Sequence, residues 1–374
     1  MKETITMKFQ RHYKYLIKPT YEQKQILMRT FGAVRFVYNH YVDDLKAGKN
    51  MRGMAKNILS GYRAQYPFLN GIDGSALMHV IFQAQDKGNT LSIHKKRKDS
   101  RVSYTTANLE KSPIRIVDGR YIELPKLGIV ELVYQRPIPE DAEIRNAAVI
   151  READGKYYVS IMVEYDRQIE NRELDLSKSI GIDYSSTHFY VDDKGNKIDM
   201  PHFFKEDEKK IAESDLKLRR MEKGSKNYYK QKLKTAAYHQ RVKNRRMDFM
   251  HKLTTELAEK YDVICIEDLD MQEISKNHHL GKRTYDNAYG LFDRYLRYKM
   301  KERGKLLLRV DCYYPSSKTC HNCGHLNYKL KLSDRIWQCE QCGMILDRDV
   351  NAAINIKTKC LSDYNRRRVS DVSL

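Results

Sequence analysis

Four cysteines near the C-terminus have the type and spacing of metal ligands. Cys320 and Cys323 form one Cys-x-x-Cys pair, and Cys339 and Cys342 form a second one. Each pair can turn two thiolates toward one ion, which is typical of a tetrahedral zinc site. Two disulfides are the alternative, but no signal peptide is recognisable and disulfides are rare in the cytosol. We therefore expect one structural Zn²⁺ here, with no open position for catalysis.

Three acidic residues are the second candidate for metal chemistry. Asp183 and Glu267 each end an apolar run, residues 180–182 and 263–266, that predicts a buried strand. Asp349 opens an expected helix close behind the fourth cysteine. This order of strand–acid, strand–acid and acid–helix is the one in which an RNase H-like fold brings its carboxylates together.

Converging carboxylates can hold two divalent cations about 4 Å apart, which activate a water and stabilise the leaving 3′ oxygen of a phosphodiester. Mg²⁺ prefers such hard oxygen ligands, and Mn²⁺ can replace it. Taken singly, each acid could be a helix cap or a solvent-facing strand end. Three acids in this order favour a metal-dependent nuclease, with Asp347 as the residue most easily confused with Asp349.

The charge balance points to a polyanionic partner. The chain carries 69 Lys and Arg against 49 Asp and Glu, a net charge of +20. Such an excess causes self-repulsion unless a polyanion neutralises it, and nucleic acid is the first candidate. Between Lys217 and Lys252, 13 basic residues stand against two acids; a solvated helix face is the alternative, but we expect phosphate contacts there. We expect no membrane partner, because no apolar run approaches roughly 18 residues and no lipidation motif is present.

The N-terminal part is expected to begin with a strand at 13–17. Thr20 and Gln23 then have the spacing of a capping box at the start of a long helix. Further expected elements are helices at 54–66 and 75–85 and a polar, basic linker at 89–112.

From residue 114 the apolar period changes to two, which predicts short strands joined by Asp-Gly hairpin turns. The expected strands span residues 114–116, 121–124, 129–133, 147–150 and 157–163. With the N-terminal strand they would form a small barrel that carries the helices as an insertion. A mixed α/β pattern begins at residue 179. Besides the two acid-bearing strands, it predicts a hairpin at 189–191 and 197–198, a helix at 286–303 and a strand at 306–310.

The acidic motifs resemble the split active site of a known family. Asp183 lies within Gly-Ile-Asp, Glu267 within Ile-Glu-Asp-Leu, and Asp349 within Asp-Arg-Asp-Val-Asn-Ala-Ala. These motifs are similar to those of the TnpB (OrfB) family, which insertion sequences encode and which is related to type V CRISPR effectors. The other segments that resemble the family are 15–23, 31–39, 124–128, 224–227, 246–252 and 315–320.

The resemblance implies an α/β multidomain protein. Its parts would be an RNase H-like (RuvC) nuclease with an inserted zinc ribbon, and a small β-barrel (WED) that carries a helical (REC) insertion. The implied boundaries are 1–18 (WED, first part), 19–108 (REC), 109–172 (WED, second part), 173–315 (RuvC, first and second motifs), 316–345 (zinc ribbon that binds the target nucleic acid), 346–360 (RuvC, third motif) and 361–374 (basic tail).

The resemblance also implies an activity. A guide RNA from the transposon end would direct cleavage of complementary double-stranded DNA beside a short adjacent motif, so that base pairing reads the sequence. Asp183, Glu267 and Asp349 would be catalytic and would bind two Mg²⁺. The segment 86–106 departs from the family pattern. The implied nucleic-acid contacts are Arg35, Tyr38, Asn39, Lys126, Lys226, Asn227, Lys230, Arg241, Arg245, Arg246 and Lys318.

Other functions use similar parts. A nuclease-inactive, RNA-guided repressor would lack one of the acids, and all three are present. A DNA strand-transfer transposase also uses three acids, and RNA in the purified protein would separate it from a guided nuclease. A relative adapted to a CRISPR system would be recognised by its gene neighbourhood. In each case we expect a cytoplasmic protein of a prokaryote, associated with the nucleoid when it acts on DNA.

Overall fold

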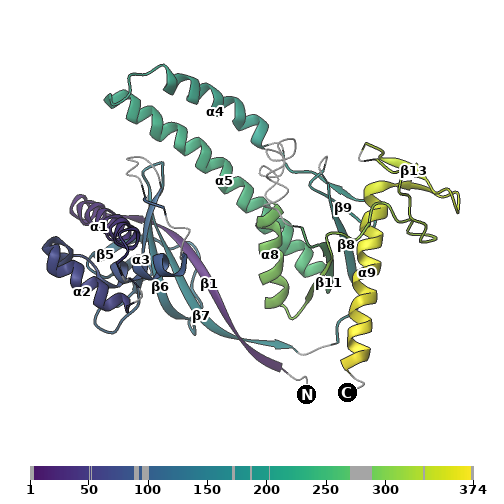
Figure 1. Ribbon diagram of the computed structural model, residues 1–374, viewed down its shortest axis with the longest axis horizontal. Coiled ribbons are helices and arrows are strands. Elements are labelled where there is room, and N and C mark those ends of the chain that lie inside the picture. Colours follow the sequence, from purple (N-terminus) through teal and green to yellow (C-terminus); the bar gives the residue numbers. More distant parts are fainter. Residues whose placement is uncertain are drawn as a thin grey trace. The chain divides into compact units, whose positions relative to one another are not determined.

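The computed structural model describes residues 4–49, 51, 53–87, 92–94, 101–170, 173–185, 188–201, 203–269, 289–331 and 333–371. The chain forms two compact units (Figure 1). The N-terminal unit consists of Met7–Arg167 and Ile211–His239, and the C-terminal unit consists of Met1–Thr6, Gln168–Lys210 and Gln240–Leu374. Within the described ranges, no helix is long and apolar enough to cross a membrane.

A seven-stranded sheet organises the N-terminal unit. Its order is β2-β6-β7-β1-β5-β4-β3. The N-terminal strand joins the later strands in one sheet, as expected, and lies in its middle. The sheet ends at β2 and β3, and closure into a barrel stays a prediction. The strands are β1 (Thr4–Lys18), β2 (Val102–Ala107), β3 (Arg115–Val117), β4 (Tyr121–Leu124), β5 (Gly128–Val133), β6 (Glu143–Arg151) and β7 (Tyr157–Glu170).

Strand β2 corrects one sequence-based interpretation. It lies inside the segment 89–112 that was interpreted as a linker, yet it pairs with β6 along its whole length. Its alternate residues Tyr104 and Thr106 are buried, which is the pattern of a half-buried strand. The strand was missed because a short alternating run adjoins a long basic run and contains several polar residues.

The hairpin turns agree with the sequence. Asp118 and Gly119 have φ angles of 50° and 61°, and both lie between β3 and β4. Left-handed conformations at two central residues are those of the tight hairpin turn that Asp-Gly favours. Gly155, between β6 and β7, has a φ of 84°. These turns fix the register of the two hairpins.

The helices between residues 21 and 87 pack with the sheet in one hydrophobic core. The capping box is confirmed, because the Thr20 side chain accepts the Gln23 N–H and the Gln23 side chain accepts the Thr20 N–H. The helices are α1 (Tyr21–Lys46), α2 (Ala55–Gln65), the short 3₁₀ helix η1 (Pro67–Gly71) and α3 (Gly74–Lys87).

A five-stranded sheet organises the C-terminal unit, with the order β10-β9-β8-β11-β12. The first three strands along the chain are antiparallel, and β11 and β12 continue the sheet parallel to β8. All five strands correspond to predicted ones. They are β8 (Ser179–Tyr184), β9 (Tyr190–Asp192), β10 (Lys197–Ile198), β11 (Val263–Glu267) and β12 (Leu306–Val310).

The long basic stretch forms two helices, α4 (Phe203–Arg219) and α5 (Lys226–Lys260). Helix α8 (Tyr289–Glu302) matches the predicted helix at 286–303, whose first three residues lie outside the described ones. Helix α9 (Arg348–Asp371) packs on β8, β11 and β12. It continues without a break past residue 360, so residues 361–371 of the expected basic tail extend the helix of the third acidic motif.

The cysteine-rich segment holds a two-stranded sheet, β13 (Ile336–Gln338) and β14 (Ile345–Asp347). Trp337 is buried there with Leu330, Leu346 and two of the cysteines. The tryptophan therefore belongs to the small hydrophobic core of the ribbon.

Candidate active site and metal centre

The three predicted acids come together at one end of the C-terminal sheet. Parallel strands β8 and β11 pair Gly181 with Cys265, and Asp183 and Glu267 each lie two residues further along. Helix α9, which carries Asp349 in its first turn, packs against the same strands. Asp183 and Asp349 are buried, and Glu267 is half-buried. Carboxylates from three separate elements thus share one region.

Gly181 allows helix α9 to approach strand β8 closely. A Cβ atom at this position would lie 2.1 Å from the carbonyl oxygen of Ala353 and 2.7 Å from Cβ of Lys357. No side chain fits into that space. The glycine of the Gly-Ile-Asp motif is therefore required for packing, two residues before the acid that the strand presents.

The acids influence one another electrostatically. Burial, together with the carboxylates of Glu267 and Asp349, raises the pKa of Asp183 well above its usual range. Burial also raises the pKa of Glu267, although a hydrogen bond from Ser316 acts in the opposite direction. Buried like charges disfavour ionisation unless a cation compensates them. The oxygen donors and this charge imbalance fit divalent cations such as Mg²⁺.

Three polar residues hold these acids through contacts that the sequence did not predict. Ser185 Oγ donates a hydrogen bond to Asp349 Oδ2 over 3.0 Å. Arg335 Nη1 lies 3.2 Å from both carboxylate oxygens of Asp349. Ser316 Oγ donates to Glu267 Oε1 over 2.6 Å. Two of them had a signal in the sequence: Ser185 follows Asp183 by two residues, and Ser316 lies in the segment 315–320 that resembles the family.

Asp347 has a different environment from Asp349. Its Oδ1 accepts the backbone N–H groups of Asp349 and Val350, at 3.0 and 3.2 Å, and therefore caps helix α9. Its Oδ2 accepts a hydrogen bond from Lys197 at 2.8 Å. Burial by itself would raise the pKa of Asp347, but the hydrogen bonds and the charge of Lys197 outweigh it, so the pKa is lowered. A capping role explains this residue, which leaves Asp349 as the acid that faces Asp183.

The four cysteines form a compact cluster of sulfur atoms. Their sulfur atoms all lie within 4.8 Å of one another. The Cys320–Cys342 and Cys323–Cys339 sulfur pairs are 3.7 and 3.6 Å apart, far beyond a disulfide bond of about 2.05 Å. Four sulfurs about 2.3 Å from a tetrahedral zinc ion would be about 3.8 Å apart. Among the described residues no other such group gathers three or more ligand atoms so closely; the three acids are spaced more widely.

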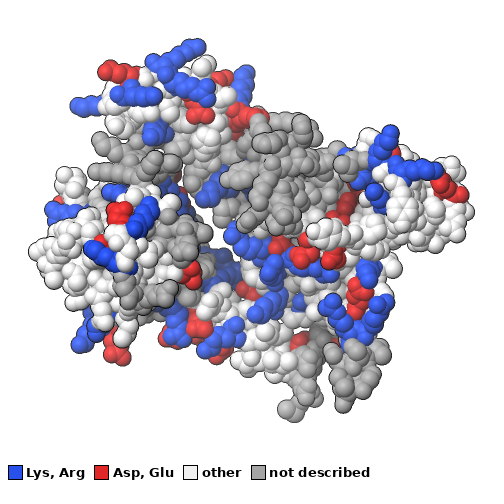
Figure 2. Space-filling model, viewed as in Figure 1, with Lys and Arg blue, Asp and Glu red and all other residues white. Residues whose placement is uncertain are grey.

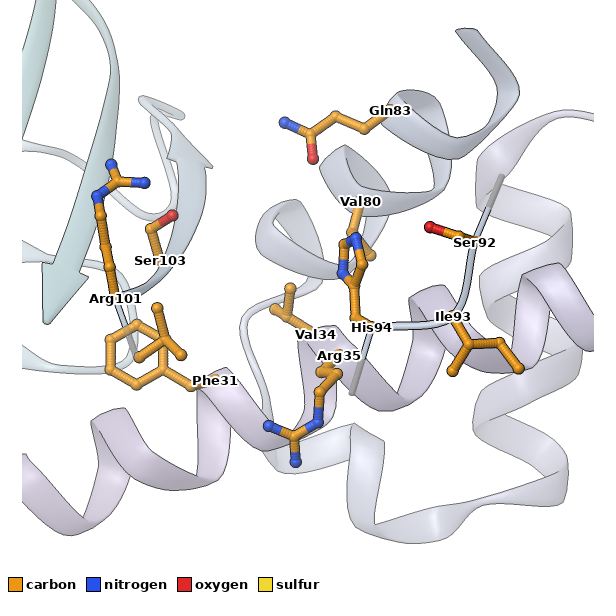
Figure 3. A pocket seen from close by; sticks show the side chains of 11 residues that line it. Phe31, Val34, Arg35, Val80, Gln83, Ser92, Ile93, His94, Arg101 and Ser103 are labelled. Atoms are coloured by element: carbon orange, nitrogen blue, oxygen red, sulfur yellow. The ribbon is translucent and has the colours of Figure 1, made fainter. Parts of the chain in front are cut away.

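A cavity of about 660 Å³ lies within the N-terminal unit. Figure 3 shows side chains from α1, α3, residues 92–94 and the start of β2 around it. Its largest polar groups are Arg35, Gln83 and Arg101. Arg35, one of the expected nucleic-acid contacts, therefore lines an open site.

The neighbouring expected contacts have other partners. Tyr38 is buried, and its ring stacks on His94 with centroids 3.8 Å apart. Asn39 forms a paired hydrogen bond with the backbone of His94, donating to its carbonyl and accepting its N–H. In this conformation the Tyr38 ring is not accessible to a nucleic acid, because the His94 ring already covers the face on which a base would stack.

The other expected contacts divide by exposure. Arg245 and Arg246 are half-buried on α5, and Arg245 forms an ion pair with the buried Asp207 at 2.9 Å. Arg245 therefore has a structural partner. Lys318 is half-buried, two residues before Cys320. Figure 2 shows Lys and Arg side chains projecting from the α4–α5 hairpin. The exposed members are Lys126, in the β4–β5 turn, and Lys226, Asn227, Lys230 and Arg241, on α5.

Comparison with known proteins places the chain in a family. Three family models match: a "Helix-turn-helix domain" of OrfB proteins over residues 7–48, a "Probable transposase" model over 160–278, and a "Cas12f1-like, TNB domain" over 289–356. A protein of Streptomyces pristinaespiralis named "Putative RNA-guided DNA endonuclease" is 32% identical over 92% of this chain and 88% of its own length. The chain belongs to the TnpB (OrfB) family.

Two more distant similarities were also found. The Escherichia coli K12 protein "Putative RNA-guided DNA endonuclease InsQ" is 28% identical over 63% of this TnpB-family chain and 61% of its own length. A solved Cas12f1–sgRNA–target DNA complex is 16% identical, covers 95% of this chain and 99% of its own, and has a TM-score of 0.46. The region that matches the helix-turn-helix model contains strand β1 and the single long helix α1.

Proposed function

We propose that this TnpB-family protein is an RNA-guided DNA endonuclease. A guide RNA from the transposon end would direct it to complementary double-stranded DNA beside a short adjacent motif. The observation that carries the proposal is the convergence of Asp183, Glu267 and Asp349 from β8, β11 and α9. Relatives of similar length carry the name of such an enzyme.

The strand order supports an RNase H-like, RuvC-type nuclease. In the C-terminal sheet, three antiparallel strands are followed by two strands parallel to the first. The acids lie near the end of the first strand, at the end of the fourth and at the start of a late helix. The seven-stranded sheet would be the WED part, and α1 to α3 the REC part. The cysteine ribbon between the second and third acids would be the target-binding insert.

The three acids would hold two Mg²⁺. When bound, these ions supply an activated water and stabilise charge on the leaving 3′ oxygen. The protein fixes the positions of the donors: Ser185 and Arg335 hold Asp349, and burial keeps bulk water from Asp183. Because Arg335 carries a positive charge beside this carboxylate, a phosphate that approaches the acids would meet a cation. The four thiolates would hold one structural Zn²⁺ with no position left for a water.

The charge distribution supports nucleic acid as the partner. Exposed Lys226, Lys230, Lys234 and Arg241 lie along α5, in the most one-sided part of a chain of net charge +20. Phosphates would neutralise this face and release counterions. The enzyme would act in the cytoplasm, on nucleoid DNA.

A cleavage assay with matched variants tests the proposal. The purified protein with its bound RNA is given a DNA that carries the RNA's complement. Asp183→Ala should abolish cutting and leave RNA-guided DNA binding nearly intact, because it removes a metal ligand and no nucleic-acid contact. Asp347→Ala, which removes a helix cap, should retain cutting, whereas Asp349→Ala should not. Undiminished cutting by Asp183→Ala would refute the assignment.

A further inference from the structure

The loop that leads into the zinc ribbon reaches the acid site. Ser316 lies four residues before the first zinc ligand, Cys320, and is 5% exposed. Its hydroxyl donates to Glu267 Oε1 over 2.6 Å. A side chain of the ribbon's own base therefore holds one of the three acids.

Two asparagines of α9 hold this loop in place. Asn355 Nδ2 donates to the carbonyl oxygens of Ser316 and Thr319, at 2.8 and 2.6 Å. Asn351 Nδ2 donates to the same two oxygens, at 3.3 and 2.8 Å. Both asparagines are buried, and they lie one helical turn apart. The loop is thus tied to the helix that carries Asp349.

Asn351 also binds the zinc knuckle. Its Oδ1 accepts the backbone N–H of His321 at 2.9 Å and lies 3.0 Å from Nδ1 of the same ring. Thr319 and His321 stand on either side of Cys320, so one amide group contacts both neighbours of a zinc ligand. Asn351 follows Asp349 by two residues.

We propose that Ser316, Asn351 and Asn355 form a brace that positions Glu267 and couples the zinc ribbon to the metal-binding acids. This inference rests on the proposed nuclease function. A carboxylate can rotate about its last bond, and a donor on one oxygen leaves the other oriented toward the ion. Groups that orient metal ligands in this way typically change metal affinity or activity by about 10–100-fold when removed.

The test compares Ser316→Ala with Ser317→Ala, the same substitution one residue further on. Among the contacts of the described residues, the Ser317 hydroxyl has no hydrogen-bond partner. Mn²⁺ binding is measured by electron paramagnetic resonance. The amount bound by Asp183→Ala, which lacks one of the three acids, is subtracted as background. The Mg²⁺ concentration for half-maximal cleavage, the zinc content and guide RNA binding are measured on the same samples.

Ser316→Ala should weaken Mn²⁺ binding and raise the Mg²⁺ midpoint, each by about 10-fold or more. High Mg²⁺ should restore most of its cleavage, and zinc content and RNA binding should match those of Ser317→Ala. Asn355→Ala should shift the midpoint in the same direction, because it releases the loop that carries the serine.

Unchanged Mn²⁺ binding and an unchanged Mg²⁺ midpoint in Ser316→Ala would overturn the brace. Loss of zinc or of RNA binding in that variant would also overturn it, since the serine would then act on the fold of the ribbon. Failure of the proposed function is a separate result: the unaltered protein would show no guided cleavage, while the Mn²⁺ measurement would still test the brace.

Discussion

Replacing Gly181 with alanine tests the close packing that brings the acids together. The added methyl group would lie 2.1 Å from the Ala353 carbonyl oxygen, whereas ordinary contact begins at 3.4 Å. Helix α9 would have to retreat by about 1.3 Å, the difference between these distances. Lys357 Cβ, at 2.7 Å, blocks a simple sideways escape. The whole first turn of the helix, with Asp349, would move away from Asp183.

We expect Gly181→Ala to lose much of its cleavage rate and a moderate part of its free energy of unfolding. A misplacement of about 1 Å at a reacting centre can cost about 100-fold in rate, so Gly181→Ala should cleave DNA about 100-fold more slowly. Overpacking a tight interior typically destabilises by about 1–3 kcal/mol. Single-turnover cleavage and urea denaturation measure the two effects on the same protein.

Gly61→Ala is the matched control. Gly61 lies inside helix α2, and a Cβ there would meet nothing within 4 Å. Alanine favours a helix interior by about 1 kcal/mol over glycine, so this variant should be as stable as the unaltered protein or more so, and fully active. The opposite result would be a cleavage rate within about threefold of that of the unaltered protein and unfolding at the same urea concentration. It would refute the close packing of β8 against α9.

Three further predictions address the other parts of the account. Cys339→Ser should lower zinc from about one ion per chain to near zero and disorder the ribbon, as measured by metal analysis and proteolysis; full zinc content in the variant would contradict the four-thiolate site. The triple charge reversal of Lys226, Lys230 and Lys234 to Glu should weaken guide RNA binding and reduce the slope of log affinity against log salt by about 2; an unchanged slope would remove this face from the RNA contacts. Arg335→Ala should slow cleavage by about 10-fold or more, while zinc content and guided DNA binding stay unchanged. Cleavage at the rate of the unaltered protein would show that the contact of Arg335 with Asp349 does not contribute to cleavage.

The sequence predicted those parts of the molecule whose chemistry imposes a spacing. A tetrahedral thiolate site needs two close pairs, so the clustering of Cys320, Cys323, Cys339 and Cys342 could be predicted without a structure. The acids were recognisable because each follows or opens a strongly patterned element. The capping box at Thr20 and the Asp118-Gly119 turn are local and were predicted correctly for the same reason.

Contacts between distant segments left little trace in the sequence. Arg335 and Ser316 are ordinary polar residues until folding brings them within hydrogen-bond distance of Asp349 and Glu267. Tyr38 matched a family signature, yet it packs on His94, a partner 56 residues away that no local pattern indicates. Strand β2 was missed because its stability comes from pairing with β6, about 40 residues further along.

The dependence of cleavage on RNA tests the central claim most directly. The RNA that copurifies with the protein is sequenced, and double-stranded DNA carrying its complement is offered to the protein before and after the RNA is removed. We predict Mg²⁺-dependent cutting of the complementary DNA by the RNA-bound protein, and no cutting of an unrelated DNA or by the RNA-free protein. Cleavage of a defined DNA site at the full rate by RNA-free protein would contradict the account and would identify a conventional nuclease or transposase.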